Sequence, residues 1–264
     1  MRKIRAYFST TLKAAFAYRI RSFIWFLIDV YPTLIFILFF SAIFSERQTI
    51  GNYSLNSILI YYLTTVSLNI LIISHPEWEI AENINQGFLS IFLLRPMSFF
   101  KFYVANELAY KTIRLGYLAP SLLILTVFFD IQKFIHINLQ EVIIFLTMAT
   151  LAFLIYLFIK ILIGFAAFWF TEITWLLGFW ESVSLLFSGL TIPIDLMPPF
   201  FQKIAAILPA KYSIYLPAQI ILGRASLKEQ FLGLSIQIAW LIFLIIFTKK
   251  IWRKGIKIYS AYGG

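Results

Sequence analysis

Apolar runs of about twenty residues recur along this chain, and they restrict its fold more than any other feature. A helix needs about 20 apolar residues to cross a bilayer, because the hydrocarbon core is about 30 Å thick. The chain is also 61% hydrophobic and 13% charged, whereas soluble domains are about half apolar and about a quarter charged. The sequence therefore predicts an all-α polytopic membrane protein with one domain over residues 1–264.

Six runs are long and apolar enough to be predicted as membrane spans. No signal-peptide cleavage site follows the first run, so we expect it to be retained as a span. The predicted transmembrane helices are residues 23–44, 55–74, 104–129, 141–168, 174–192 and 231–247. An even number of spans places both termini on the same side of the membrane.

Basic residues at both ends of the chain predict which side that is. Six Lys and Arg residues precede the first span and five follow the last, and short cytoplasmic segments of membrane proteins carry such an excess. Both termini are therefore expected in the cytoplasm. The net charge of +10 is therefore explained by the topology of the chain. It does not indicate that the protein binds nucleic acid.

Residues 1–21 are predicted to form a helix that lies in the headgroup layer instead of crossing it. The apolar side of this helix consists of Ile4, Phe8, Thr11 and Ala15. Arg2 and Lys13 fall roughly opposite, on the polar side that an interfacial helix requires. A basic tail that only sets the orientation of the chain is the alternative.

The segment 193–228, before the last span, contains too many prolines for a transmembrane helix. They are Pro193, Pro198, Pro199, Pro209 and Pro217. The helical pieces between them are too short to cross a bilayer. We expect external helices that lie in the interface or enter the membrane and return.

The longest polar interruption, Glu77–Lys101, lies between the second and third spans and is predicted to be cytoplasmic. Helical spacing over residues 77–96 separates two faces. The apolar face contains Ile80, Ile84, Gly87, Phe88 and Ile91, and the polar face contains Glu79, Glu82, Asn83 and Gln86. We expect a short helix across the end of the bundle, ended by Arg95 and Pro96, with its polar face toward a partner. A solvated loop without a partner is the alternative.

Residue types for catalysis are few in this chain. His75 and His136 are the only histidines, and the predicted topology puts them on opposite sides of the membrane, which excludes a shared metal or acid–base site. The sequence contains no cysteine, no glycine-rich phosphate loop and no HExxH motif. It therefore predicts no catalytic residue, no metal site and no cofactor bound by this chain.

Ionisable residues inside the predicted spans are costly in hydrocarbon, so they indicate contacts with protein or water. They are Asp29, Lys160, Glu181 and, nearer the inner edge, Glu107 and Arg114. One interpretation is a polar lining of a substrate pathway. The other, slightly favoured, is pairing between helices, for example of Asp29 with Lys160 or Arg114. Glu181 is the most central acid and the first candidate for a role in transport.

Two stretches resemble the ABC-2 type permeases, the membrane subunits of bacterial ABC exporters. QGFLSIFLLRPMSFF is similar to the family's G-x-L-x-x-x-L-L-R-P stretch after the second span. FSGLTIPIDLMPPFFQKIAAILPAKYSIYLPAQIILG is similar to its pattern of S-G-x-x-x-P, L-P, Y-x-x-x-P and a final Gly. The matching positions are Ser188, Gly189, Pro193, Leu208, Pro209, Tyr212 or Tyr215, Pro217 and Gly223. Ala210 departs from the aromatic residue expected after L-P.

The resemblance covers nearly the whole chain and implies that residues 77–96 are a coupling helix for a separate cytoplasmic ATPase. The residues implied in this coupling are Glu79, Glu82, Asn83, Gln86, Gly87, Arg95 and Pro96. It also implies a dimer with a second copy or a sister permease, in the bacterial plasma membrane. ATP and Mg²⁺ would be bound by the ATPase, since this chain has no nucleotide-binding motif.

Two other classes of function stay open from the sequence. One is a proton-coupled secondary transporter that uses Asp29 and Glu181, and the other is a membrane-embedded enzyme or assembly factor. The composition of the spans does not identify a transported substrate.

Overall fold

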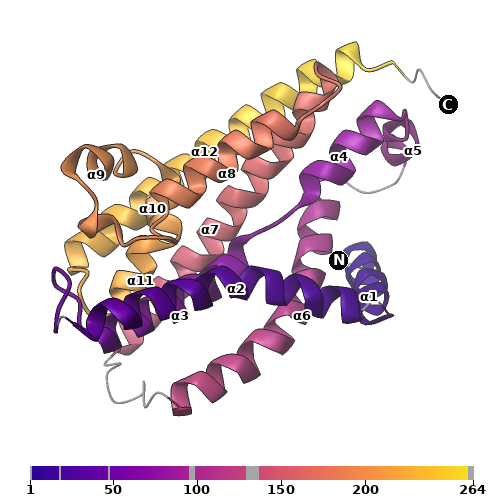
Figure 1. Ribbon diagram of the computed structural model, residues 1–264. Helices are drawn as coiled ribbons and strands as arrows, with labels where there is room; N and C mark the ends of the chain where they lie inside the picture. The colour runs from indigo at the N-terminus through magenta and orange to yellow at the C-terminus, as the bar shows by residue number, and fades with distance from the viewer. Residues whose placement is uncertain (1, 18, 47, 95–98, 129–136, 261–264) are drawn as a thin grey trace.

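Long helices that run lengthwise through the molecule make up most of the structure (Figure 1). The structure is a computed structural model that describes residues 2–17, 19–46, 48–94, 99–128 and 137–260. The long helices are α2 (Arg19–Phe44), α3 (Leu55–Ile72), α6 (Phe99–Phe128), α7 (Leu139–Phe165), α8 (Thr174–Phe187) and α12 (Leu227–Ile258). No strand occurs within the described ranges, so the predicted all-α class is confirmed.

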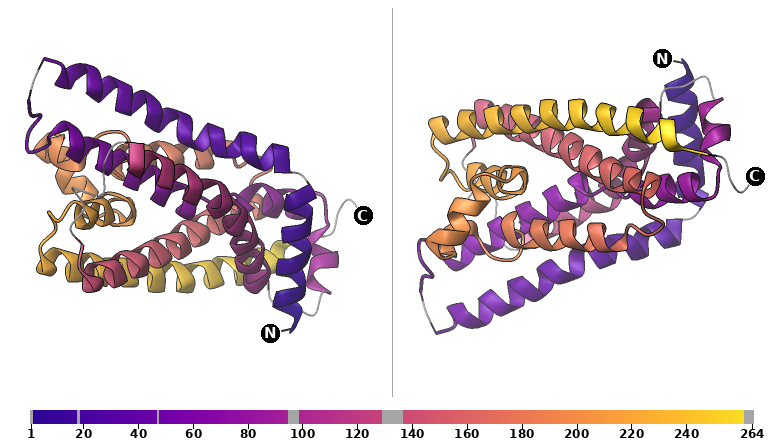
Figure 2. Two further views of the ribbon diagram at one scale, coloured as in Figure 1. Left: turned by 90° about the horizontal axis from the view of Figure 1, so that it is seen from below. Right: turned by 90° about the horizontal axis from the view of Figure 1, so that it is seen from above.

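Short helices gather at the two opposite ends of the long ones (Figures 1 and 2). At one end, called the α4 end here, lie α4 (Pro76–Asn85), α5 (Leu89–Leu93) and the C-terminal end of α12. α1 (Arg2–Ala17) crosses the same end, where the Thr11 hydroxyl donates to Asn106 Oδ1 of α6 over 3.0 Å. The other end, the α9 end, holds α9 (Pro199–Ala205), α10 (Pro209–Ser213) and α11 (Tyr215–Ile221).

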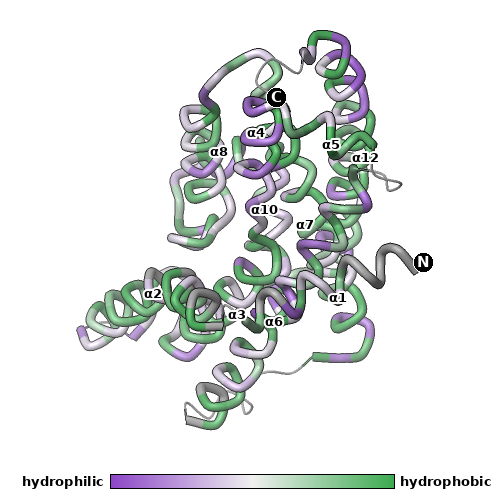
Figure 3. Tube along the Cα trace, turned by 90° about the vertical axis from the view of Figure 1, so that its right-hand side faces the viewer, coloured by the Kyte–Doolittle hydropathy of each residue, from purple (hydrophilic) through white to green (hydrophobic). Residues whose placement is uncertain are grey.

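Three described helical segments are long and apolar enough to cross a membrane: Leu55–Asn85, Leu139–Phe168 and Leu227–Ile258. A fourth results if Pro199–Ala205 and Pro209–Ile221, which meet at 77°, are counted as one bent span. α2 is also hydrophobic over most of its length (Figure 3). The chain is therefore a multi-pass helical protein, and the six-span arrangement stays a prediction.

The predicted fifth span, residues 174–192, is wrong at its end, because α8 stops at Phe187. Gly189 follows with a φ of +82°, a conformation that strains any residue with a side chain. A Cβ on Gly189 would also lie 2.6 Å from Tyr61 Oη. Tyr61 and Tyr62 of α3 donate hydrogen bonds to the carbonyls of Gly189 and Thr191. These bonds hold the break after α8 in place.

The last helix is longer than the predicted span 231–247, since α12 runs from Leu227 to Ile258. Ser226 and Glu229 form a capping box that starts it. The Lys and Arg residues near its other end continue the helix, because they are good helix formers and their charge is favoured near a helix C-terminus. The helix therefore extends past the apolar stretch.

Hydrogen bonds also connect the proline-rich segment 193–228, at the α9 end, to the residue before α3. Pro199 and Pro209 each take the first position of a short helix, where the missing N–H costs nothing. Tyr53, just before α3, donates to Asp195 Oδ1 over 2.9 Å and accepts from Gln219 Nε2 over 2.6 Å. Burial, followed by the nearby Asp195 carboxylate, raises the pKa of Tyr53, so its hydroxyl stays protonated and remains a donor.

Candidate functional site

The helix α4 is seated on the side of α7. Pro76 takes its first position, and Ile80 and Ile84 are only 1% and 7% exposed. Gly164 of α7 lies directly beneath, where a Cβ would be 2.8 Å from Ile80 Cβ and 3.1 Å from the Glu77 carbonyl oxygen. The absence of a side chain at Gly164 is therefore what allows α4 to approach the backbone of α7 so closely.

A lysine on α7 joins α4 and α8 at this seat. Lys160 Nζ lies 3.1 Å from Glu77 Oε1 in the first turn of α4 and 3.1 Å from Glu181 Oε1 of α8. The side chains of Lys160 and Glu77 are 3% and 0% exposed, whereas that of Glu181 is 53% exposed. Removing one partner of a buried ion pair leaves an uncompensated charge, so the pair with Glu77 is the one on which the fold depends more.

His75 adds a third side chain to this cluster. Its Nδ1 lies 3.1 Å from Glu77 Oε1, and Glu77 Oε2 is buried without a hydrogen-bond partner among the described residues. His75, Glu77 and Glu181 each bring one ligand atom within 4.8 Å of the others, and these residue types bind divalent metals. The Lys160 ammonium contacts both carboxylates, however, and so supplies the positive charge that a metal would supply.

The predicted single helix over residues 77–96 is wrong, because the chain turns at Gly87. Gly87 has a φ of +80°, which ends the regular spacing of α4 and starts α5 in a new direction. The apolar face is therefore correct for Ile80 and Ile84 and wrong beyond the turn, where Phe88 and Ile91 are 49% and 59% exposed. α5 buries Leu89 and Phe92 instead.

The turn between α4 and α5 is held by the residue that follows α12. Tyr259 Oη donates to the Gly87 carbonyl over 2.6 Å and accepts from the Ser90 N–H over 3.2 Å. Beneath it, the Trp252 ring packs 4.6 Å from Phe99 and 5.0 Å from Phe165, measured between centroids. Sequence reasoning missed Tyr259, since no local pattern connects it to a turn 172 residues earlier.

The predicted polar side of α4 lies on the surface of the chain. Glu79, Glu82 and Gln86 are exposed and Asn83 is half-buried, with Gln86 Nε2 donating to Glu82 Oε1 over 3.1 Å. Trp78 beside them is 49% exposed. Arg95 and Pro96 lie outside the described residues. This arrangement gives α4 one side against the bundle and one side open to a partner.

The predicted intramembrane charges divide between three places. Lys160 and Glu181 meet in the cluster with Glu77, whereas the suggested pairing of Lys160 with Asp29 stays a prediction. The Asp29 side chain and His136 lie outside the described part of the chain. Arg114 is half-buried on α6. The apolar sequence around Lys160 indicated that this lysine needs a counter-charge. Glu77 was not recognised as that counter-charge, because the sequence places it in the polar loop between two spans.

A second buried lysine, also missed as a site residue, supports the hinge before α4. Lys111 of α6 donates to the carbonyl oxygens of Ile73 and Ile70 at the end of α3. Helix C-termini favour positive charge because their last carbonyls lack partners in the helix. Lys111 thus fixes the direction in which the chain leaves α3 and enters α4.

The comparison with known families identifies the class of this chain. Residues 15–263 match the family model described as ABC-2 family transporter protein. No curated protein matches the sequence. The family model spans almost all of the described helices, including α4, Gly164 and the Lys160 cluster. The chain belongs to the ABC-2 transporter family and is a multi-pass membrane permease of an ABC transporter.

Proposed function

We propose that this permease is the membrane subunit of an exporter and that a separate cytoplasmic ATPase drives it. Two permeases, identical or sister chains, would form the substrate pathway between them, in the bacterial plasma membrane and with both termini in the cytoplasm. The chain itself would carry no enzymatic activity, and ATP and Mg²⁺ would be held by the ATPase. Family membership supports the outline of this proposal.

The proposal rests mainly on the two faces of α4, one of which is exposed while the other packs against α7. Its outer side presents Glu79, Glu82 and Gln86, while its inner side is fixed by Ile80 on Gly164 and by Glu77 on Lys160. A push on the outer side would therefore reach α7 directly. Packed helices move as rigid bodies, so closure of the ATPases would shift α4 and α7 together.

The exposure of Glu181 supports a pathway beside α8. A carboxylate inside a membrane faces protein or water and avoids lipid, yet the Glu181 side chain is 53% exposed on the single chain. The second permease or a water-filled route would cover it. Because Lys160 contacts both Glu181 and Glu77, movement of α4 would also change the position of the charge that faces this route.

Co-purification with a nucleotide-binding ATPase tests the proposal. Reversing the charge of Glu82, in a Glu82→Lys variant, should abolish retention of the ATPase on the tagged permease in detergent. Glu46→Lys is the matched control, because Glu46 is also an exposed acid but lies outside α4, between α2 and α3. Retention of the ATPase by Glu82→Lys, or transport that continues without ATP and follows a proton gradient, would contradict the proposal.

A further inference from the structure

The outer face of α12 changes from apolar to basic along two continuous stripes. One stripe is Ile242, Ile246, Lys249, Arg253 and Lys257, and the other is Phe243, Phe247, Lys250 and Lys254. Steps of three and four residues keep each stripe on one side of a helix. The four apolar residues are all exposed: Ile242 by 54%, Ile246 by 62%, Phe243 by 52% and Phe247 by 40%. A single surface of the chain thus joins large apolar side chains to cations.

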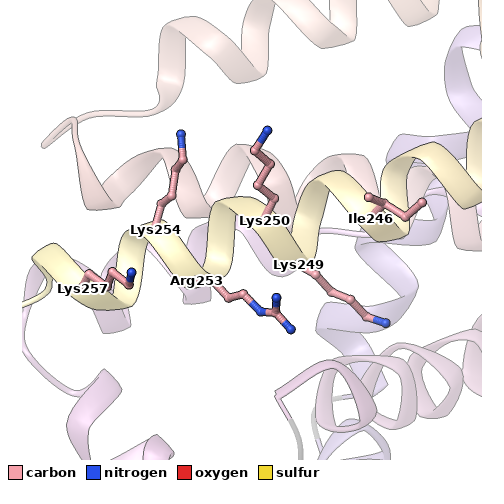
Figure 4. Close-up of a pocket in the computed structure, with 6 residues that line it drawn as sticks. All are labelled: Ile246, Lys249, Lys250, Arg253, Lys254 and Lys257. Carbon is pink, nitrogen blue, oxygen red and sulfur yellow. The ribbon is translucent and has the colours of Figure 1, made fainter.

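The five cations of these stripes are Lys249, Lys250, Arg253, Lys254 and Lys257. All are exposed, and within the part of the chain that the structure describes, no carboxylate forms an ion pair with any of them. Together with Ile246 they line a hollow of about 350 Å³. Figure 4 shows Lys250 and Lys254 pointing to one side of α12, and Lys249 and Arg253 pointing to the other. The hollow therefore concentrates positive charge that a ligand would have to balance.

The position of the cations along the helix agrees with the depth of lipid phosphates. Residues 231–248 of α12 rise about 27 Å, at about 1.5 Å per residue, which is close to the thickness of the hydrocarbon core of about 30 Å. A span over these residues would place Lys249 as the first residue past the hydrocarbon. The cations follow immediately, where the headgroups of one leaflet lie, while Ile242 and Phe243 remain at the depth of acyl chains.

We propose that the end of α12 binds an anionic phospholipid of the surrounding bilayer. Its phosphate would lie in the hollow between the two stripes, where the long side chains of Lys249, Lys250, Arg253 and Lys254 would bend toward it from either side, and its acyl chains would lie along the exposed side chains of Ile246 and Phe247. A basic cluster next to a transmembrane helix attracts anionic lipid, with about 1 kcal/mol for each Lys or Arg near the surface. The apolar half of each stripe favours a lipid over a soluble anion, because only a lipid satisfies both halves.

This site also bears on the α4 end of the molecule. Tyr259 follows the last cation by two residues and holds the turn at Gly87. A lipid that orders the end of α12 would therefore order the Tyr259 contact as well. The proposal does not depend on the ATPase, since the lipid is tested on the permease alone.

Native mass spectrometry of the detergent-purified full chain tests the site. Phosphatidylglycerol and phosphatidylcholine with the same acyl chains are titrated separately, and their dissociation constants are compared. In the Lys250→Gln/Arg253→Gln variant the Kd for phosphatidylglycerol should rise about thirtyfold, about fivefold for each cation. The Kd for phosphatidylcholine should not change. Three cations remain in this variant, which preserves the excess that sets the topology.

A matched double variant separates a local site from overall charge. Lys203→Gln/Lys228→Gln removes two exposed cations outside the α4 end and should leave the Kd for phosphatidylglycerol unchanged. An equal rise in both double variants would overturn the proposal. So would displacement of phosphatidylglycerol by equal concentrations of free glycerol phosphate, since that result identifies a soluble anion as the ligand.

A measurement on the unmodified chain covers the case in which the variant does not fold. Raising the salt concentration should weaken the binding of phosphatidylglycerol and leave that of phosphatidylcholine unchanged, because exposed charges are screened. Equal responses of the two lipids to salt would refute the site.

Discussion

Lys160 Nζ lies 3.1 Å from Glu77 Oε1, in the buried contact between α7 and α4, although 83 residues separate the two in sequence. The ammonium also touches Glu181 of α8. One side chain thus links the helix on the surface of the α4 end with two of the long helices. Loss of this link is expected to affect stability and transport in different ways, depending on which partner is changed.

Replacing the lysine should destabilise the protein strongly. Lys160→Met leaves the buried Glu77 carboxylate without its partner, and the free energy of unfolding should fall by about 3 to 5 kcal/mol. Thermal denaturation in detergent, followed by size-exclusion chromatography, measures the change. The double variant Lys160→Met/Glu77→Gln should be more stable than Lys160→Met, because it removes both charges. A double variant less stable than either single one would show that the pairing is not what matters.

Replacing the exposed acid should affect transport more than stability. Glu181 is 53% exposed, so its pair with Lys160 contributes at most about 1 kcal/mol. Glu181→Gln should therefore assemble normally and bind the ATPase, but transport should fall clearly. ATP-dependent uptake of the exported substrate into inverted membrane vesicles measures this change. Glu172→Gln is the control, because Glu172 is also an exposed acid and follows α7. Normal transport by Glu181→Gln would rule out a role in the pathway.

Adding one methyl group at the seat of α4 should push the two helices apart. Gly164→Ala places a Cβ 2.8 Å from Ile80 Cβ, and overpacking of this kind costs about 1 to 3 kcal/mol. We expect a lower Tm and weaker binding of the ATPase. Gly116→Ala is the control, since nothing lies within 4 Å of its added Cβ, and it should be neutral or stabilise by up to about 1 kcal/mol. Equal behaviour of the two variants would argue against a close contact.

Removing one hydroxyl should loosen the turn between α4 and α5. Tyr259→Phe loses the partly buried hydrogen bonds to Gly87 and Ser90, each of which contributes about 0.5 to 1.5 kcal/mol. Amide hydrogen exchange should become faster at Ser90 and in the rest of the turn, with little change in the middle of α7. Tyr110→Phe, at an exposed position on α6, should leave exchange in the turn unaltered. Unchanged protection at Ser90 in Tyr259→Phe would contradict the proposed role.

Much of this protein could be predicted because membrane constraints are local. A run of apolar residues must be helical in lipid, whatever its neighbours are, and this argument predicted the all-α class that the structure confirms. The resemblance in two stretches was likewise confirmed by the match over residues 15–263. The seat of Ile80 and Ile84 followed from helical spacing within a single helix.

Prediction failed at two glycines that end helices. Gly87 and Gly189 both take positive φ values, and each ended a helix that hydropathy had continued. Periodicity cannot reveal such a break, because glycine also occurs inside helices, as Gly164 does. The exposed positions of Phe88 and Ile91 are a direct consequence of the turn at Gly87.

By itself, the sequence determined that this chain is a helical membrane permease and that a lysine in an apolar span needs a counter-charge. The tertiary structure alone decided that Glu77 and Glu181 provide it. Ion pairing requires a separation of a few ångströms, and that separation depends on how α4 packs onto α7 at Gly164. Such a distance between remote segments is set by packing, which no local pattern of residue types contains.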